Sequence, residues 1–266
     1  MRNETVTLKV DGLNIIGRLC LPDGNGPFPA VCICHGISAG KYDPDDKGYP
    51  ALAEKVCRQG FAVFFFNFRG TRTSEGNFDI LGWVDDLYTA IDYLYALPSV
   101  DRSHISLLGF SAGAAVAIYE AAHNPKVSAV VSGASPAEFT FFTEDNLDSV
   151  IDRFRAISII RDNGFPPSPE EWLHNFRRIS PVRHVSGIAP RPLLILHGNR
   201  DDMVDISHAR QLHDAAGEPR ELIIIDGAGH RLRQDDKAMT IAISWLKSRN
   251  QAGPGNRPAN CPLPGK

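Results

Sequence analysis

The chain has 266 residues, which is long enough for one large α/β domain or two smaller ones. Hydrophobic residues make up 43% of it and charged residues 22%, a composition that excludes a disordered chain and a coiled coil. The formal net charge of −3 gives no overall field that attracts phosphate groups, so nucleic acid and anionic membrane surfaces are poor candidate partners.

The N-terminal residues and the cysteines indicate a cellular location. Residues 1–7 alternate polar and apolar side chains and lack the continuous apolar segment of a secretory signal. No later apolar run reaches the length of a membrane span. The five cysteines are an odd number, and four of them lie among apolar residues, which favours reduced thiols (Cys20, Cys32, Cys34 and Cys57). We therefore expect a cytoplasmic protein.

Apolar runs alternate with amphipathic stretches along the first half of the chain, a rhythm typical of a mostly parallel sheet flanked by helices. Residues 5–10 and 13–21 are predicted to form an opening hairpin around Asp11-Gly12. Apolar runs then predict strands at 29–34, 61–68, 105–108 and 127–131. Amphipathic spacing predicts helices at 51–59, 83–97 and 112–123.

The rhythm breaks between residues 136 and 185, which are rich in aromatic, charged and proline residues. Helical patterns at 147–161 and 169–178 predict a helical cap inserted into the core. The rhythm then resumes, with strands expected at 192–196 and 221–225 and helices at 206–216 and 236–247. The predicted organisation is a core of residues 1–135 and 186–250, a cap of residues 136–185 and a disordered, proline-rich tail of residues 251–266.

The sharpest local motif is Gly109-Phe110-Ser111-Ala112-Gly113, a G-x-S-x-G between a predicted strand and a predicted helix. A serine at such a tight turn sits in a strained backbone conformation, and small residues at Gly109 and Gly113 remove the clashes that the turn creates. The turn lifts the Ser111 hydroxyl above the sheet edge. It also leaves the N–H of Ala112 at a helix N-terminus, where it can donate to a developing anion. This placement predicts a nucleophile elbow.

A serine hydroxyl is a weak nucleophile unless a base takes its proton, and the base needs an acid that orients it. Asp201 follows the strand predicted at 192–196, and His230 follows the strand predicted at 221–225. Parallel strands place such loops at one edge of the sheet, where ligands bind in open α/β sheets. Ser111, Asp201 and His230 therefore form a predicted catalytic triad, with Asp202 as the alternative acid.

Five short motifs resemble those of the α/β-hydrolase superfamily, especially its single-domain esterase-like members related to dienelactone hydrolases and to the catalytic domains of prolyl oligopeptidases. They are His35-Gly36, Phe68-Arg69-Gly70, Gly109 to Gly113, His197-Gly198-x-x-Asp201 and Gly229-His230. The resemblance covers nearly all of the chain before the tail. It implies the α/β-hydrolase fold, with a sheet of about eight strands, and the chain order of serine, acid and histidine. It also implies that the N–H of Ile37 pairs with that of Ala112 as an oxyanion hole.

The predicted cap carries aromatic residues that suit an acyl or aromatic pocket, among them Phe139, Phe142 and Trp172. Packing of the cap onto the core explains the same residues equally well. Four arginines of the cap are more simply explained as solvated surface charge than as ligands for a substrate carboxylate (Arg153, Arg155, Arg177 and Arg178).

The sequence therefore predicts a serine hydrolase, most simply a carboxylesterase that acts on a small-molecule acyl ester. No metal or organic cofactor is expected, because Cys32-x-Cys34 has no second ligand pair at a suitable spacing. A peptidase, an amidase or a thioesterase would use the same triad, and the fold also serves as a catalytically silent binding module. The oligomeric state stays open, with a homodimer as one alternative.

Overall fold

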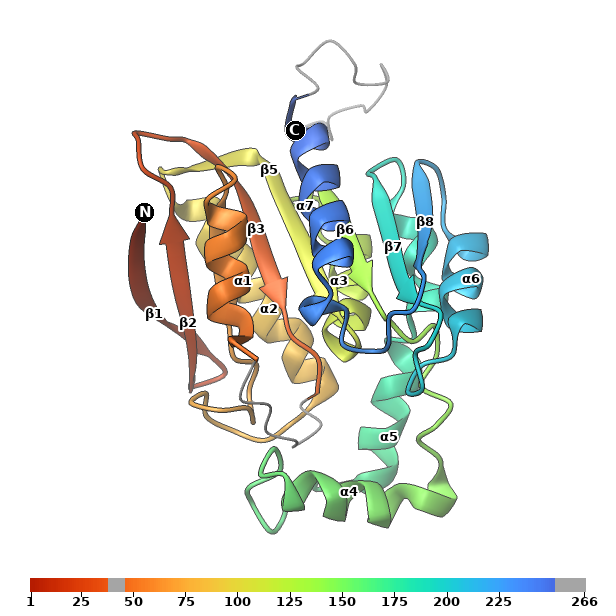
Figure 1. The fold of residues 1–266 in the computed structure, drawn as a ribbon. Coiled ribbons are helices and arrows are strands. Elements are labelled where there is room, and N and C mark those ends of the chain that lie inside the picture. Colours follow the sequence, from red (N-terminus) through yellow and green to blue (C-terminus); the bar gives the residue numbers. More distant parts are fainter. Residues whose placement is uncertain (38–45, 252–266) are drawn as a thin grey trace, which may run out of the picture.

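The computed structural model describes residues 1–37 and 46–251, which form one eight-stranded sheet with helices on both faces (Figure 1). The strands lie in the order β1-β2-β4-β3-β5-β6-β7-β8. β1 pairs with β2, and β2 with β4, in antiparallel fashion, and the other neighbours are parallel. The predicted mostly parallel α/β sheet is confirmed. The strands span Arg2–Val10 (β1), Leu13–Leu21 (β2), Phe28–Cys34 (β3), Ala62–Phe66 (β4), Val100–Phe110 (β5), Ala129–Gly133 (β6), Leu193–Gly198 (β7) and Arg220–Ile225 (β8).

The helices form two layers, with α1 and α7 on one face of the sheet and α2, α3 and α6 on the other (Figure 1). Strand β3 is apolar throughout because Cys32 packs with the second layer while its neighbours Val31 and Ile33 pack with the first. No helix in the described part of the chain is long and apolar enough to cross a membrane. The α-helices span Gly48–Cys57 (α1), Ile80–Ala96 (α2), Ala112–His123 (α3), Leu147–Ala156 (α4), Pro169–Arg178 (α5), Ile206–Ala215 (α6) and Asp236–Gln251 (α7), and short 3-10 helices span Glu144–Asn146, Pro181–Arg183, Val185–Ile188 and Leu232–Gln234.

The two largest differences in length from the sequence prediction are in α4 and β5. The helix predicted at 147–161 ends at Ala156, because Ser158 adopts a φ of 60° and turns the chain back. Strand β5 is longer than the predicted 105–108, since Val100 pairs with Phe28 at the start of β3 and the polar residues 101–104 continue the strand from there. Of the predicted tail at 251–266, Gln251 ends α7, and residues 252–266 lie outside the described residues.

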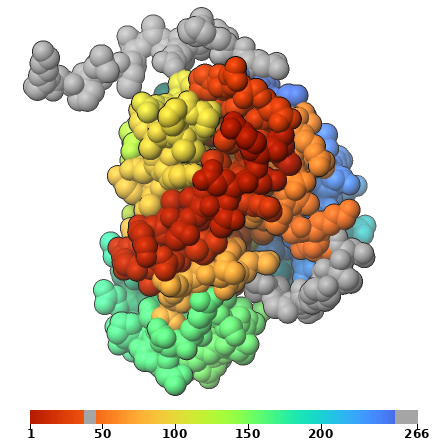
Figure 2. Space-filling model, turned by 90° about the vertical axis from the view of Figure 1, so that its left-hand side faces the viewer, coloured from red at the N-terminus to blue at the C-terminus, as the bar shows by residue number. Residues whose placement is uncertain are grey.

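Helices α4 and α5 belong to the segment between β6 and β7, and they lie beyond the ends at which the parallel strands finish (Figure 1). In the space-filling view this green segment forms the lower end of the molecule and is continuous with the rest (Figure 2). A single buried cluster joins it to the core, because Phe78 contacts the rings of Phe154, Trp172 and Phe176. The segment therefore shares its apolar core with the sheet.

Hydrogen bonds also fix this segment to the loop that follows β4. The N–H of Phe78 donates to the carbonyl of Ile159 at 2.7 Å. The guanidinium of Arg161 reaches across the same junction and donates to three backbone carbonyls of the loop (Gly70 at 3.2 Å, Arg72 at 3.0 Å and Ser74 at 2.7 Å). Both links leave from the turn after α4, so this end of the segment is held in place.

Candidate active site

Ser111 lies at the corner between β5 and α3, where its backbone has a φ of 52°. A residue with a side chain rarely occupies this left-handed region, so the surrounding structure must hold it there. The Ser111 N–H donates to the carbonyl of Gly133 on the neighbouring strand at 2.9 Å, and the Ser111 carbonyl accepts from the N–H of Ala114 at 2.9 Å. The corner is thus fixed from the sheet on one side and from the helix on the other.

Two glycines make this corner possible. A Cβ atom at Gly109 would lie 2.6 Å from the Cα atom of Ala114, and one at Gly113 would lie 2.2 Å from the carbonyl oxygen of His35. Both are backbone atoms that have little room to move. The steric reason that the sequence motif suggested is therefore present at both positions.

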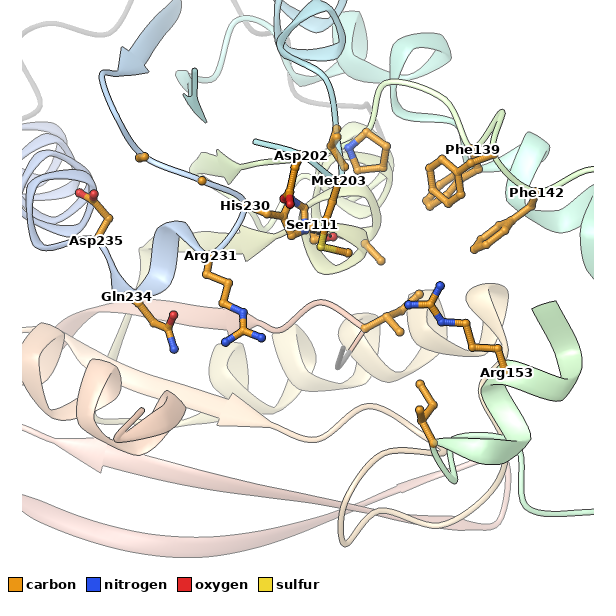
Figure 3. Close-up of a pocket in the computed structure, with 18 of the residues that line it drawn as sticks. Ser111, Phe139, Phe142, Arg153, Asp202, Met203, His230, Arg231, Gln234 and Asp235 are labelled. Atoms are coloured by element: carbon orange, nitrogen blue, oxygen red, sulfur yellow. Dashed lines mark hydrogen bonds between the residues drawn. The ribbon is translucent and has the colours of Figure 1, made fainter. Parts of the chain in front are cut away.

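The structure brings Ser111, His230 and Asp201 into one hydrogen-bonded row. His230 Nε2 lies 3.0 Å from Ser111 Oγ, and His230 Nδ1 lies 2.8 Å from Asp201 Oδ2. Because a carboxylate only accepts, Nδ1 carries the proton and Nε2 is free to accept from the hydroxyl. Ser111 and His230 lie side by side at the centre of the pocket (Figure 3).

Asp201 is buried, and its carboxylate is held by the loop that follows β7. Its Oδ1 accepts from the N–H groups of Met203 and Val204, both at 2.9 Å. Burial alone would raise the pKa of Asp201, but the hydrogen bonds from His197, His230 and the backbone outweigh it and hold this pKa well below its usual range. Asp201 is therefore ionised at neutral pH.

The neighbouring acids of this loop have other surroundings. Asp202 is exposed and lines the pocket, and no hydrogen bond joins it to His230 within the described residues. Asp205 caps α6 by accepting from the N–H of Ser207 at 2.8 Å. Among the three acids, the one that contacts the imidazole is Asp201.

His197, the first residue of the motif that contains Asp201, is fully buried beneath the same loop. Its Nε2 lies 2.8 Å from the carbonyl of Val204 and 3.3 Å from Asp201 Oδ2. Both neighbours are acceptors, so Nε2 carries the proton and donates to them. His197 thus braces the acid loop.

The two expected oxyanion donors line the same pocket as Ser111. Ala112 is the first residue of α3, so its N–H has no acceptor within the helix. Ile37 follows Gly36, which runs directly against the nucleophile: a Cβ atom at Gly36 would lie 2.9 Å from Ser111 Cβ. Both N–H groups therefore belong to backbone that borders the Ser111 side chain.

His35 sets the direction of the Ile37 N–H. The Phe68 N–H donates to His35 Nε2 at 3.1 Å, so the ring proton is on Nδ1, which donates to the carbonyl of Gly36 at 2.8 Å. In a planar trans peptide the N–H points opposite to the carbonyl, so the Ile37 N–H points away from His35. Burial lowers the pKa of His35 to about 4, and the ring is neutral at pH 7.

A cavity of about 940 Å³ opens above the Ser111 hydroxyl. One side has an aromatic wall that includes Phe139, Phe142 and Phe154 (Figure 3). Trp172, the third expected pocket residue, does not line the cavity. It is buried against the core, where its Nε1–H donates to the carbonyl of Phe78 at 3.2 Å, so the structure does not bring it to the site with Phe139 and Phe142.

Comparison with known proteins places this site in a family. The sequence model described as BD-FAE matches residues 19–216, which is most of the chain. The protein belongs to the BD-FAE family. This family is esterase-like and has the α/β-hydrolase fold, so the fold and the resemblance inferred from the sequence motifs are confirmed.

Relatives of this BD-FAE protein include the thiohydrolase aneE of Aspergillus aculeatus, which is 30% identical over 203 residues. That match covers 74% of the chain and 60% of the thiohydrolase, so the chain spans less than two thirds of this relative. The solved α/β hydrolase GrgF from Penicillium sp. superposes with a TM-score of 0.73, at 19% identity over 94% of this chain and 99% of its own. Est1E from Butyrivibrio proteoclasticus, solved with ferulic acid, gives a TM-score of 0.66 at 17% identity, over 91% of this chain and 96% of its own.

The sequence prediction treated one residue of the BD-FAE protein's pocket as solvated surface charge. Arg153 lines the cavity, whereas Arg155, Arg177 and Arg178 do not. Arg153 lies three residues after Val150 and four before Ile157, at the border of the apolar face of α4. Arg155 lies four residues after Ile151, at the other border, so the helical spacing alone does not distinguish the two arginines.

Proposed function

We propose that the protein is a serine hydrolase that cleaves a carboxylic ester through an acyl-enzyme. The observation that carries this proposal is the 3.0 Å contact between His230 Nε2 and Ser111 Oγ, with Asp201 on the opposite side of the same imidazole. An activated nucleophile requires this arrangement of hydroxyl, base and orienting acid. The wall of Phe139 and Phe142 supports a small or aromatic acyl substrate.

In the first half of the reaction, Ser111 Oγ attacks the acyl carbonyl while His230 Nε2 takes its proton. Asp201 stabilises the imidazolium that forms, and the N–H groups of Ile37 and Ala112 bind the oxyanion. The carbon–oxygen bond to the alcohol then breaks, and His230 returns the proton to the leaving oxygen. Water repeats these steps on the acyl-enzyme and releases the acid. Every proton moves between serine, histidine, alcohol and water, so the cycle needs no cofactor.

A thioester is the second candidate substrate, because the matched relative from Aspergillus aculeatus is a thiohydrolase. The same triad would act on it, and the thiolate that leaves is the more stable anion and needs less help from His230. An oxygen ester and a thioester with the same acyl group, measured as kcat/KM, separate the two candidates. A higher value for the thioester would make thioester hydrolysis the primary activity.

Labelling with a fluorophosphonate probe tests the proposal directly. We expect covalent modification of Ser111 and turnover of 4-nitrophenyl acetate, with labelling lost in Ser111→Ala and kcat lowered by about 10⁶, as for nucleophile removal in other serine hydrolases. Ser103→Ala, which alters an exposed serine of β5, is the matched control and should behave as wild type. A protein that is neither labelled nor active would instead be a binding module on this fold.

A further inference from the structure

Arg153 projects from α4 into the cavity that contains Ser111 (Figure 3). Its guanidinium points toward the nucleophile and lies below the rings of Phe139 and Phe142 in this view. Within residues 1–37 and 46–251 it makes no hydrogen bond, ion pair or ring contact. A cation thus faces the reaction centre from an aromatic wall without a protein partner.

Three other arginines of helices α4 and α5 have protein partners. Arg155 pairs with Asp152 at 3.2 Å and donates to the carbonyl of Phe165 at 3.1 Å. Arg177 lies 3.9 Å from Glu144, and Arg178 donates to Asn175 at 3.4 Å. These contacts show that acceptors are available to cap arginines, so the lack of one at Arg153 reflects its direction into the pocket.

The acidic groups of the pocket lie away from Arg153. Asp235 accepts from the N–H of Ala238 at 2.8 Å and caps the start of α7, at the opposite end of Figure 3 from Arg153. Asp202 comes from the loop after β7, and Ser111 lies between it and Arg153 in the same view. Arg231 is the second cation that lines the pocket, and it lies on the other side of Ser111 from Arg153 in the same view. Arg153 is therefore the charged group at the aromatic end, and the other charged side chains lie elsewhere.

We propose that the substrate carries a carboxylate in addition to the scissile ester, and that Arg153 binds it. This inference rests on the proposed hydrolase function and names the class of its substrate. A guanidinium presents a planar fork of N–H donors that matches a carboxylate with two parallel hydrogen bonds. One guanidinium balances the single charge of a carboxylate, and the phenylalanine rings of the same wall can pack against the apolar part of such a substrate.

A series of monoesters tests this assignment. Mono-4-nitrophenyl esters of linear diacids of increasing length are each paired with the neutral 4-nitrophenyl ester of the same chain length, and kcat/KM is measured after subtraction of spontaneous hydrolysis. We expect the ratio of anionic to neutral kcat/KM to reach a maximum at one chain length, namely the length that spans Ser111 and Arg153. That ratio should fall by about 10- to 100-fold in Arg153→Gln, because the hydrogen bonds from the charged guanidinium to the substrate carboxylate are lost.

Two further variants separate the charge of Arg153 from its hydrogen-bond geometry and from positive charge elsewhere on the protein. Arg153→Lys keeps the charge and loses the fork, so it should recover part of the ratio. Arg210→Gln removes one positive charge from the exposed face of α6, outside the pocket, and should leave the ratio at its wild-type value. High salt should lower the ratio in wild type and change it little in Arg153→Gln.

An equal loss on anionic and neutral esters in Arg153→Gln would overturn the inference, since it would assign a structural role to Arg153. A wild-type ratio that never exceeds that of Arg153→Gln would do the same. In both cases neutral esters are still hydrolysed and Ser111 is still labelled, so the proposed function stands. Absence of labelling and of turnover on every ester would contradict the hydrolase function itself.

Discussion

At the scale of single residues, the site depends on which groups keep a charge and which stay neutral. The hydrogen bonds around Asp201 favour its charged form, whereas burial of His35 favours the neutral ring. The first gives His230 a permanent anion on its Nδ1 side. The second gives the loop at Ile37 a hydrogen-bond geometry that does not change at neutral pH.

Asp201→Asn tests the first of these roles. The amide can still accept from the two N–H groups of the loop, but its NH₂ would face His230 and favour the wrong tautomer, so we expect kcat on 4-nitrophenyl acetate to fall by about 10⁴. Asp202→Asn is the matched variant and should keep activity of the same order as wild type. The reverse pattern would transfer the acid role to Asp202.

The nucleophile, acid and base could be expected from the sequence because each follows a recognisable strand, and the ends of parallel strands meet at one edge. Side chains of the helical segment could not be placed in the same way. Trp172 and Arg153 both lie on amphipathic helices, but the packing of α4 and α5 on Phe78 decides which of them faces the cavity. That packing is a tertiary property that helical spacing alone does not determine.

At the scale of elements, predicted boundaries are good where a side chain marks the end. Helix α5 begins at Pro169 as predicted, because Ser168 accepts from the N–H of Glu171 and caps it. Helix α4 ends early, because Ser158 has a φ of 60° and the N–H groups of Ser158 and Ile159 donate back to the last turn of the helix. No local residue pattern announces such a turn.

His35 connects three elements of the fold. It directly follows β3, and its Nε2 accepts from the Phe68 N–H in the loop after β4. Its ring packs edge-on against Trp83 of α2. Its pKa is near 6.5 in the unfolded chain and about 4 in the folded one, so the unfolded state binds the extra proton between these values. The contribution of His35 to the free energy of unfolding is complete above pH 6.5 and decreases as the pH falls toward 4. Between pH 7 and pH 5 this contribution to the free energy of unfolding falls by about 2 kcal/mol.

His35→Asn removes this titration. The variant should be less stable at pH 7 by about 1–3 kcal/mol, because the Phe68 N–H loses its acceptor. The difference from wild type should then narrow by about 2 kcal/mol at pH 5, where wild type has lost the contribution of the neutral ring. Urea denaturation at the two pH values measures both quantities, and His174→Asn, on the exposed face of α5, is the control. A difference that stays constant with pH would contradict this account.

At the scale of the whole molecule, the relation between core and cap decides how the pocket is built. We propose that residues 136–185 are a cap that is fixed to the core at the turn after α4. The shared cluster around Phe78 and the contacts of Arg161 support a cap that unfolds together with the sheet. The aromatic wall and Arg153 then keep one position relative to Ser111.

Arg161→Ala tests this coupling. The variant loses three hydrogen bonds from a charged donor to the loop after β4, so we expect the free energy of unfolding to fall by about 1–2 kcal/mol. Because the cap and the sheet share one core, tryptophan fluorescence and far-UV circular dichroism should report the same single transition in wild type and in the variant. Arg178→Ala, which loses only a contact within α5, should leave the transition in place. A separate early transition in either protein would mean that the cap unfolds independently and that the junction at Phe78 does not hold it.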